Sequence, residues 1–212
     1  MKKVFKSVVV VAVLVAATVS ASAQVSINAG YVSSTATDNG KTTDPVSGIA
    51  AGIGYDMNIQ GGVGLAWGLN YTYAWDKVSQ ELPIVGTITA KSTDHYLDVP
   101  VRLTYTLPLS GDLSVFGFAG PKFVYALAGN TKIGDGDPID HYKDLDLGAL
   151  GKVENDLSRF DIKAGLGAGV QFKNISVKAG YDWGLLNQYE GKTAEKNTLK
   201  SNNFYVGLGF AF

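Results

Sequence analysis

The sequence predicts an all-β fold, namely an eight-stranded antiparallel transmembrane β-barrel with an up-and-down meander topology. Three observations predict it: an N-terminal export signal, segments in which bulky apolar residues alternate with small or polar ones, and connections that alternate between long and short. Alternation with a period of two gives a strand two chemically different faces. Short turns on one side of the membrane and long loops on the other are typical of outer-membrane barrels.

The first residues have the pattern of a cleaved signal peptide. The charged start MKKVFK is followed by the apolar run Val8 to Val19 and by the small residues Ser20 to Ala23, directly before Gln24. The apolar run is shorter than the roughly 20 residues that a spanning helix needs. We therefore predict a signal peptide over residues 1–23 and one barrel domain over residues 24–212. The chain has no cysteine, so a lipid anchor on cysteine and disulfides are both excluded.

Composition agrees with a β protein that does not bind nucleic acid. Removal of the three signal lysines leaves 15 Lys and Arg against 19 Asp and Glu, a net charge of −4. The chain contains 26 glycines, 11% aromatic residues and only 6 prolines, which favours strands joined by turns. The mature chain has no second apolar run of spanning length, so a helical membrane protein is excluded.

Eight segments carry the alternation, and their two faces differ in side-chain size. In chain order they are 25–31, 48–56, 62–75, 95–107, 116–127, 161–172, 175–185 and 203–212. One face is bulky and apolar, as in Phe204, Val206 and Leu208, whereas the other is largely Gly, Ala, Ser and Asn with some charges. Such small residues suit a narrow lumen, so we assign the bulky face to lipid. A soluble sandwich or a lipocalin-like barrel is the alternative.

The connections sort into two kinds. Long ones are expected at 36–45, 76–92, 130–157 and 187–198, and short ones at 59–61, 108–112 and 173–174, which places both termini in the periplasm. Phe116 and Phe118 have the opposite parity to Phe123 and Tyr125, so a β-bulge is predicted at Gly120-Pro121. Aromatic girdles at the membrane interfaces are expected from Tyr31, Tyr55, Trp75, Tyr105, Tyr125, Trp183 and Tyr205.

Four stretches resemble a known family. They are HYLDVPVRLTYTL, FGFAGPKFVYALAG, RFDIKAGLGAGVQFKNISVKAGYDWGLLN and NNFYVGLGFAF. Together they resemble the Bacteroidetes-type outer-membrane β-barrel domain, a group that includes PorT-like proteins and is similar in architecture to the OmpX family. The resemblance implies a location in the outer membrane of a Gram-negative bacterium. Its PorT-like members imply an accessory role in protein secretion.

A network of charges is predicted inside the barrel. The charged residues with inward parity are Asp56, Asp98, Arg102, Asp161, Lys163, Lys178 and Asp182. Charges withdrawn from bulk water must be paired and hydrogen-bonded, so we expect Arg102 to pair with Asp98, and Lys163 or Lys178 to pair with Asp161 or Asp182. Because eight strands enclose room only for side chains, we predict a filled lumen and a structural network; a transport pathway is the alternative.

The sequence predicts no enzyme, no cofactor and no metal site. The two histidines, His95 and His141, have no spacing to Ser92 or Ser158 that marks a nucleophile with its base. The acidic stretch from Gly134 to Asp146 lacks the ordered carboxylates of an EF-hand loop and is predicted to be a solvated loop. Weak divalent-cation binding there is the alternative.

We therefore expect an integral, porin-like outer-membrane protein with a structural or surface-interaction role carried by four extracellular loops. The alternatives are an accessory component of a secretion system, a small pore, and a lipid-active enzyme. Expected partners are outer-membrane lipid and lipopolysaccharide, the assembly machinery that receives the terminal Phe212 strand, and a surface or secretion-system protein. The barrel is expected to be a monomer.

Overall fold

The computed structural model describes residues 23–82, 86–134, 136–146, 152–153 and 157–212, so the predicted signal peptide lies outside the described residues except for Ala23. The long strands are β1 (Ala23–Asp38), β3 (Val46–Gln60), β4 (Val63–Leu82), β5 (Gly86–Ser110), β6 (Leu113–Ile133), β10 (Phe160–Phe172), β11 (Ile175–Gly184) and β12 (Leu199–Ala211). The connections contain β2 (Lys41–Thr42), β7 (Ile139–Asp140), β8 (Leu145–Asp146), β9 (Lys152–Val153) and the helix α2 (Gly191–Lys196). Among the described residues, no helix has the length and hydropathy needed to cross a membrane.

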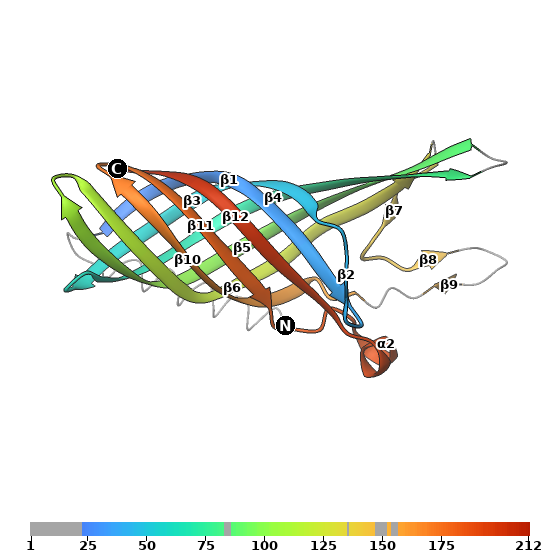
Figure 1. Ribbon diagram of the computed structural model, residues 1–212. Coiled ribbons are helices and arrows are strands. Elements are labelled where there is room, and N and C mark those ends of the chain that lie inside the picture. The colour runs from blue at the N-terminus through green and yellow to red at the C-terminus, as the bar shows by residue number, and fades with distance from the viewer. Residues whose placement is uncertain (1–22, 83–85, 135, 147–151, 154–156) are drawn as a thin grey trace.

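The long strands close into a ring. Each pairs antiparallel with the next in the chain, β6 pairs with β10, and the last strand β12 pairs with the first strand β1. At the closure, Ile27 of β1 lies opposite Phe210 of β12 on one side and Ile53 of β3 on the other. The tilted strands wrap around a common axis (Figure 1). The predicted antiparallel meander is confirmed.

Exposure follows the pattern of a barrel that faces lipid. Leu208 and Leu103 on the outer face are 60% and 59% exposed, whereas the charged Asp182 and Lys163 on the inner face are 0% and 2% exposed. A soluble fold would bury the large apolar residues and expose the charges. The inverted arrangement agrees with the assignment of the bulky face to lipid.

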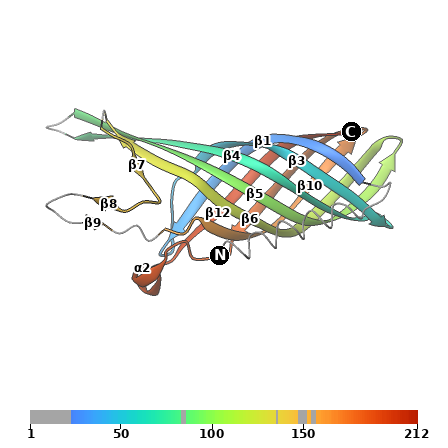
Figure 2. The same cartoon turned by 180° about the vertical axis from the view of Figure 1, so that it is seen from behind.

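The two ends of the barrel differ. Turns of two residues, Gly61-Gly62, Gly111-Asp112 and Lys173-Asn174, join strands at one end, which we call the short-turn end. Gly61 and Gly62 have φ angles of +61° and +84°, a region that glycine adopts without a steric penalty. The remaining connections, with β2, β7 and α2, gather at the opposite long-loop end (Figures 1 and 2).

The predicted loop at 76–92 is wrong, because a hairpin fills most of it. β4 continues to Leu82 and β5 begins at Gly86, with pairing from Asp76 opposite Ser92 to Leu82 opposite Gly86. β-branched residues such as Val78 favour the extended backbone. The hairpin continues beyond the ring (Figure 1). It therefore lies outside the hydrocarbon core of the membrane, and the hydropathy alternation that marked the other strands is lost.

The predicted bulge at Gly120-Pro121 is also wrong. The register of β6 against β10 is continuous there, with Gly120 opposite Gly165 and Pro121 opposite Ala164. Phe118 points into the lumen because its neighbour on β10, Gly167, has no side chain; a Cβ there would collide with the Phe118 ring. Aromatic rings that cover glycines across a strand pair are a known device in sheets.

A change of facing in β6 does occur, but farther along the strand. The register with β5 shifts where His95 lies opposite Ala128 and Tyr96 lies opposite Ala126. The guanidinium of Arg159 donates to the carbonyl oxygens of Ala126 at 3.2 Å and Leu127 at 2.9 Å. The carbonyls that the bulge frees are therefore satisfied.

Ring closure can be tested with cysteines, since the natural chain has none. Ala29 lies opposite Leu208 on β12 and opposite Ala51 on β3. We predict that the pair Ala29→Cys and Leu208→Cys forms an oxidative cross-link in membranes as readily as the control pair Ala29→Cys and Ala51→Cys. The cross-link is read from mobility on a denaturing gel. A cross-link in the control pair alone would contradict a closed ring.

Candidate functional site

Three charged side chains meet at the centre of the lumen, and we call them the charge cluster: Arg102, Lys122 and Asp182. Nη2 of Arg102 and Nζ of Lys122 each lie 2.5 Å from an oxygen of the Asp182 carboxylate. Arg102 also donates to the carbonyl oxygen of Gly120. A Cβ at Gly165 would collide with Asp182 and Arg102, so this glycine provides the space in which the cluster forms.

The cluster differs from the expected pairing. Arg102 pairs with Asp182 across the lumen, and Asp98 instead accepts hydrogen bonds from Asn70 at 3.0 Å and Thr72 at 3.1 Å. Asp98 and Arg102 are four residues apart on one strand, roughly 13 Å, which separates their side chains. Lys122 is absent from the network predicted from the sequence, because the bulge predicted at Gly120-Pro121 lies next to it.

A second ion pair lies toward the long-loop end. Nζ of Lys163 is 3.6 Å from a carboxylate oxygen of Asp161, one of the pairings expected from sequence. The same ammonium donates to the carbonyl oxygen of Ser201 at 2.9 Å, to the Ser201 hydroxyl, and to the Asn203 side chain at 3.0 Å. Gln188 donates to Asp161 at 3.1 Å. The buried lysine is therefore surrounded by acceptors, as its 2% exposure requires.

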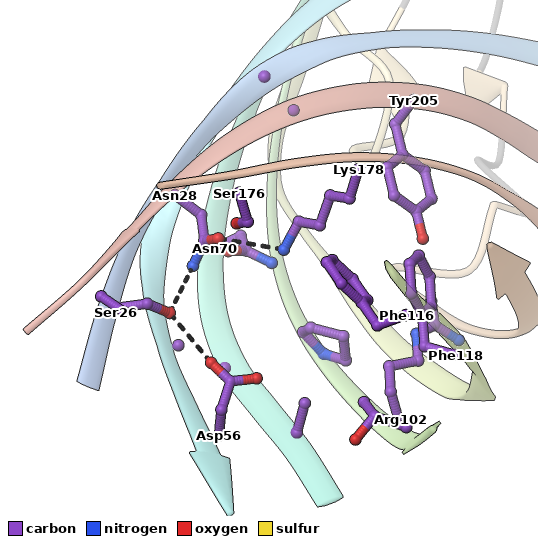
Figure 3. Close-up of a pocket in the computed structure, with 18 of the residues that line it drawn as sticks. Ser26, Asn28, Asp56, Asn70, Arg102, Phe116, Phe118, Ser176, Lys178 and Tyr205 are labelled. Atoms are coloured by element: carbon purple, nitrogen blue, oxygen red, sulfur yellow. Dashed lines mark hydrogen bonds between the residues drawn. The ribbon is translucent and has the colours of Figure 1, made fainter. Parts of the chain in front are cut away.

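Lys178 and Asp56 lie at the two ends of a chain of hydrogen bonds on the barrel wall (Figure 3). Lys178 donates to Asn28 at 3.1 Å, Asn28 donates to Ser26 at 3.2 Å, and Ser26 donates to Asp56 at 3.3 Å. A Cβ at Gly54 would lie within 3 Å of both the Ser26 and the Asn28 side chains. Two neutral side chains therefore link the ammonium and the carboxylate.

This wall borders a cavity of about 460 Å³, so the prediction of a lumen filled along its whole length is wrong. The cavity reaches the short-turn end, where Asp112 and Lys173 line it, and it extends inward to Arg102 and Asp182. Its volume lies within the range of roughly 300–1,000 Å³ that is typical of small-molecule pockets. Glycine and serine on the inner face leave this space open. The prediction of a filled lumen rested on the number of strands, which does not give the size of the side chains inside.

Aromatic rings form the other wall of the cavity. Phe116 and Phe118 project into it from β6 and Tyr205 from β12 (Figure 3). Phe118 stacks on Tyr205 with ring centroids 6.5 Å apart, and Lys122 lies 5.7 Å from the Tyr205 ring centroid. The arrangement can accommodate a small polar molecule from the short-turn end, while the charge cluster separates this cavity from the rest of the lumen.

A smaller cavity of about 170 Å³ lies beyond the cluster, and the third long connection covers its mouth. His141 in this connection contacts Asp94 through Nδ1 at 3.1 Å and Thr131 through Nε2 at 2.6 Å. Tyr142 lies beside it under the guanidinium of Arg159, 4.6 Å from the ring centroid. Burial, followed by the nearby Asp94, raises the pKa of Tyr142 to about 12, so the ring stays neutral at physiological pH.

Of the other residues considered from sequence, Ser92 shares Thr131 as a partner with His141, whereas His95 and Ser158 have different partners. His95 is on the outer face, 2.5 Å from the Tyr71 hydroxyl, Ser92 bonds Thr131 at 2.8 Å, and Ser158 bonds the backbone of Phe160. In the acidic third connection, no group of His, Cys, Asp or Glu among the described residues is placed to hold a metal ion, and Asp135 lies outside them.

Asp140, in the same connection, organises a turn. It accepts from the backbone N–H of Tyr142 at 2.9 Å and pairs with Lys143 at 3.0 Å. These contacts hold the pKa of its carboxyl below the ordinary value, the backbone hydrogen bond contributing most. The stabilisation is therefore present above the ordinary pKa and is lost as the pH falls through the lowered one.

These features define an integral β-barrel protein of the outer membrane. The chain belongs to the outer membrane protein beta-barrel domain family, which it matches over residues 16–190. No curated protein sequence matches it.

Solved barrels have similar chain traces. Ail of Yersinia pestis, in complex with the heparin analogue sucrose octasulfate, is 19% identical with a TM-score of 0.45, covering 91% of this chain and all of Ail. Neisserial surface protein A is 12% identical with a TM-score of 0.45, covering 91% of this chain and all of that chain. OprG of Pseudomonas aeruginosa is 14% identical with a TM-score of 0.42, covering 90% and 96%.

The charge cluster should dominate the stability of the barrel. Asp182→Asn leaves Arg102 and Lys122 close together without a counter-charge, and we predict a loss of about 3–5 kcal/mol in the free energy of unfolding. The measurement is urea unfolding in lipid vesicles, followed by tryptophan fluorescence. The matched control is Asp112→Asn, whose partner Lys173 lies 3.8 Å away with both side chains 61% exposed. A surface pair contributes about 0–1 kcal/mol, so equal losses in the two variants would contradict the account.

Proposed function

We propose that the protein is a non-conducting, non-enzymatic monomeric barrel that binds a partner at the cell surface through its long-loop end. One observation carries the proposal: the β4–β5 hairpin continues past the ring and leaves one edge of β4 unpaired. The last pair between β3 and β4 joins Ser47 and Trp75, whereas β4 runs on to Leu82. Short turns of outer-membrane barrels lie in the periplasm, so the hairpin is on the outside.

The free edge of β4 is suited to a protein partner. Within the described part of the chain no strand pairs with β4 between Asp76 and Leu82 on the side away from β5. An exposed strand edge presents a row of backbone donors and acceptors to which an extended segment of another protein can add. A solvated loop without secondary structure has no such preformed row. The hairpin is therefore a preorganised docking edge.

The proposal can be tested in living cells with a photo-crosslinking amino acid. Placed at Ser79 on the free edge, it should give one adduct of defined mass that externally added protease removes. Placed at Asn174 in a short turn, it should give no protease-accessible adduct. Absence of an adduct at Ser79 and at the neighbouring edge position Lys77, in cells that display the folded barrel, would contradict a surface partner at this edge.

Closure of the lumen supports the non-conducting part of the proposal. We predict that the purified, folded protein gives no stable conductance steps in planar bilayers, because the charge cluster separates the two cavities. A variant with Arg102, Phe118 and Asp182 all changed to alanine joins the cavities and is expected to conduct. Stable steps from the natural protein would favour the alternative of a small pore.

One arrangement favours a catalytic alternative. Thr131, His141 and Asp94 follow the order hydroxyl, imidazole and carboxylate, which hydrolases use for nucleophilic catalysis. The Thr131 hydroxyl is engaged by Ser92 and the group lies on the inner face, away from lipid. We propose that His141 instead anchors the third connection over the lumen. Hydrolysis of an acyl ester by the purified protein, abolished by His141→Ala, would overturn this assignment.

A role in secretion is the remaining alternative, and it rests on the PorT-like resemblance. It differs from surface binding in its consequence for the cell. Deletion of the gene would remove secreted proteins from the medium in the secretion role. In the surface role, deletion leaves secretion unchanged and abolishes only the adduct at the hairpin edge.

A further inference from the structure

Three lysines lie side by side across the hairpin and the strand next to it, and we call them the lysine row: Lys77, Lys91 and Lys132. In the strand register, Lys77 of β4 lies opposite Lys91 of β5, and Lys91 lies opposite Lys132 of β6. All three side chains are exposed. Neighbouring strands are about 4.8 Å apart, so the three ammonium groups crowd one narrow band of surface.

The row is unfavourable for the protein by itself. Like charges directly opposite each other on paired strands destabilise a sheet. Among the described residues, none of the three lysines forms an ion pair. The repulsion is therefore uncompensated by the part of the chain that the structure describes, and an external anion would relieve it.

The position of the row relative to the membrane indicates which kind of anion would relieve this repulsion. Along the outer face of β4, the apolar Leu69 is followed by Tyr71, Tyr73 and Trp75, and then by Lys77. Tyr73 and Trp75 stack with centroids 5.6 Å apart, and Leu69, Tyr71 and Trp75 are exposed. Aromatic side chains of this kind lie at the headgroup level of a membrane.

The lysine row lies directly above this aromatic band. Lys77 is two residues beyond Trp75, which corresponds to about 7 Å along a strand. The lysines of the neighbouring strands lie at the same position relative to the aromatic band. Trp75 lies opposite Thr93, Thr93 lies opposite Asn130, and each of these residues is two positions from the lysine of its strand. The three ammonium groups therefore project from the side of the barrel at the height of the lipid phosphates.

We infer that the lysine row binds the phosphate groups of a phosphorylated glycolipid of the outer leaflet, the lipid A part of lipopolysaccharide. Phosphate oxygens accept strong hydrogen bonds from ammonium groups, and one phosphate can contact two neighbouring lysines. The acyl chains of the same lipid lie along the apolar residues below the aromatic band. Lys77 also lies on the free edge of β4, but the row is formed by side chains on the outer flank of the barrel and not by backbone groups of that edge, so the inference does not depend on the proposed function.

Native mass spectrometry of the full folded protein in detergent tests the inference with bisphosphorylated lipid A as the probe. The variant is the triple change Lys77→Gln, Lys91→Gln and Lys132→Gln. The matched control removes three exposed lysines that are not in register: Lys41→Gln, Lys143→Gln and Lys200→Gln. We expect at least tenfold weaker retention of lipid A in the lysine-row variant and unchanged retention in the control.

A second readout separates binding from loss of fold. In micelles without phosphate, the lysine-row variant is expected to unfold at a temperature equal to or above that of the natural protein, because repulsion is removed. Dephosphorylated lipid A should bind the natural protein as weakly as the triple variant binds bisphosphorylated lipid A.

Three results would overturn the inference. Equal retention by the natural protein and the lysine-row variant would exclude the row. Equal binding of bisphosphorylated and dephosphorylated lipid A would exclude phosphate recognition. Inorganic phosphate that binds as tightly as lipid A would assign the row to a soluble anion and exclude a lipid ligand.

Discussion

The structure depends on one constraint, namely that the strands must close on themselves because the hydrocarbon core of a membrane supplies no hydrogen-bond partners. An open sheet would leave a row of backbone N–H and C=O groups in lipid at a cost of several kcal/mol each. Pairing of β1 with β12 removes both edges within the membrane. A long free edge, on β4 beyond Trp75, lies where water is available. Closure thus determines where the protein can present a docking edge.

Closure also explains the chemistry of the interior. A ring this narrow has an inner face that bulky apolar residues would overfill, so glycine and other small residues predominate and a few long charged side chains cross the space. Asp182 lies between Arg102 and Lys122 and holds strands β5, β6 and β11 together across the lumen. Gly165 makes this contact possible. Phe118 and Tyr205 stack on the side of the short-turn cavity. The result is a closed centre between the two cavities described above.

Much of this could be predicted from the sequence, because period-two alternation reports which face meets lipid. The short turns and the ring of eight segments followed from it, as did the inward position of Asp182 and Lys163. The pairing partners of the charges could not be predicted. The alternation shows only that Asp182 and Arg102 both point inward, and not that they meet across the lumen. The β4–β5 hairpin was missed for a related reason: outside the membrane both faces are wet, so the alternation that identifies a strand disappears.

The outer face is organised by depth, from aliphatic residues to aromatic rings and then to the lysine row. One surface therefore both holds the barrel at its level in the membrane and presents positive charge to the lipid phosphates.

All of these features require a closed ring. Amide hydrogen exchange of the folded protein in lipid nanodiscs, measured by NMR, tests closure most directly. The account predicts that the amides of Ile27 and Leu208, at the β1–β12 seam, exchange as slowly as those in the middle of β4 and β5. Fast exchange along β1 and β12, with protection confined to the other strands, would contradict it.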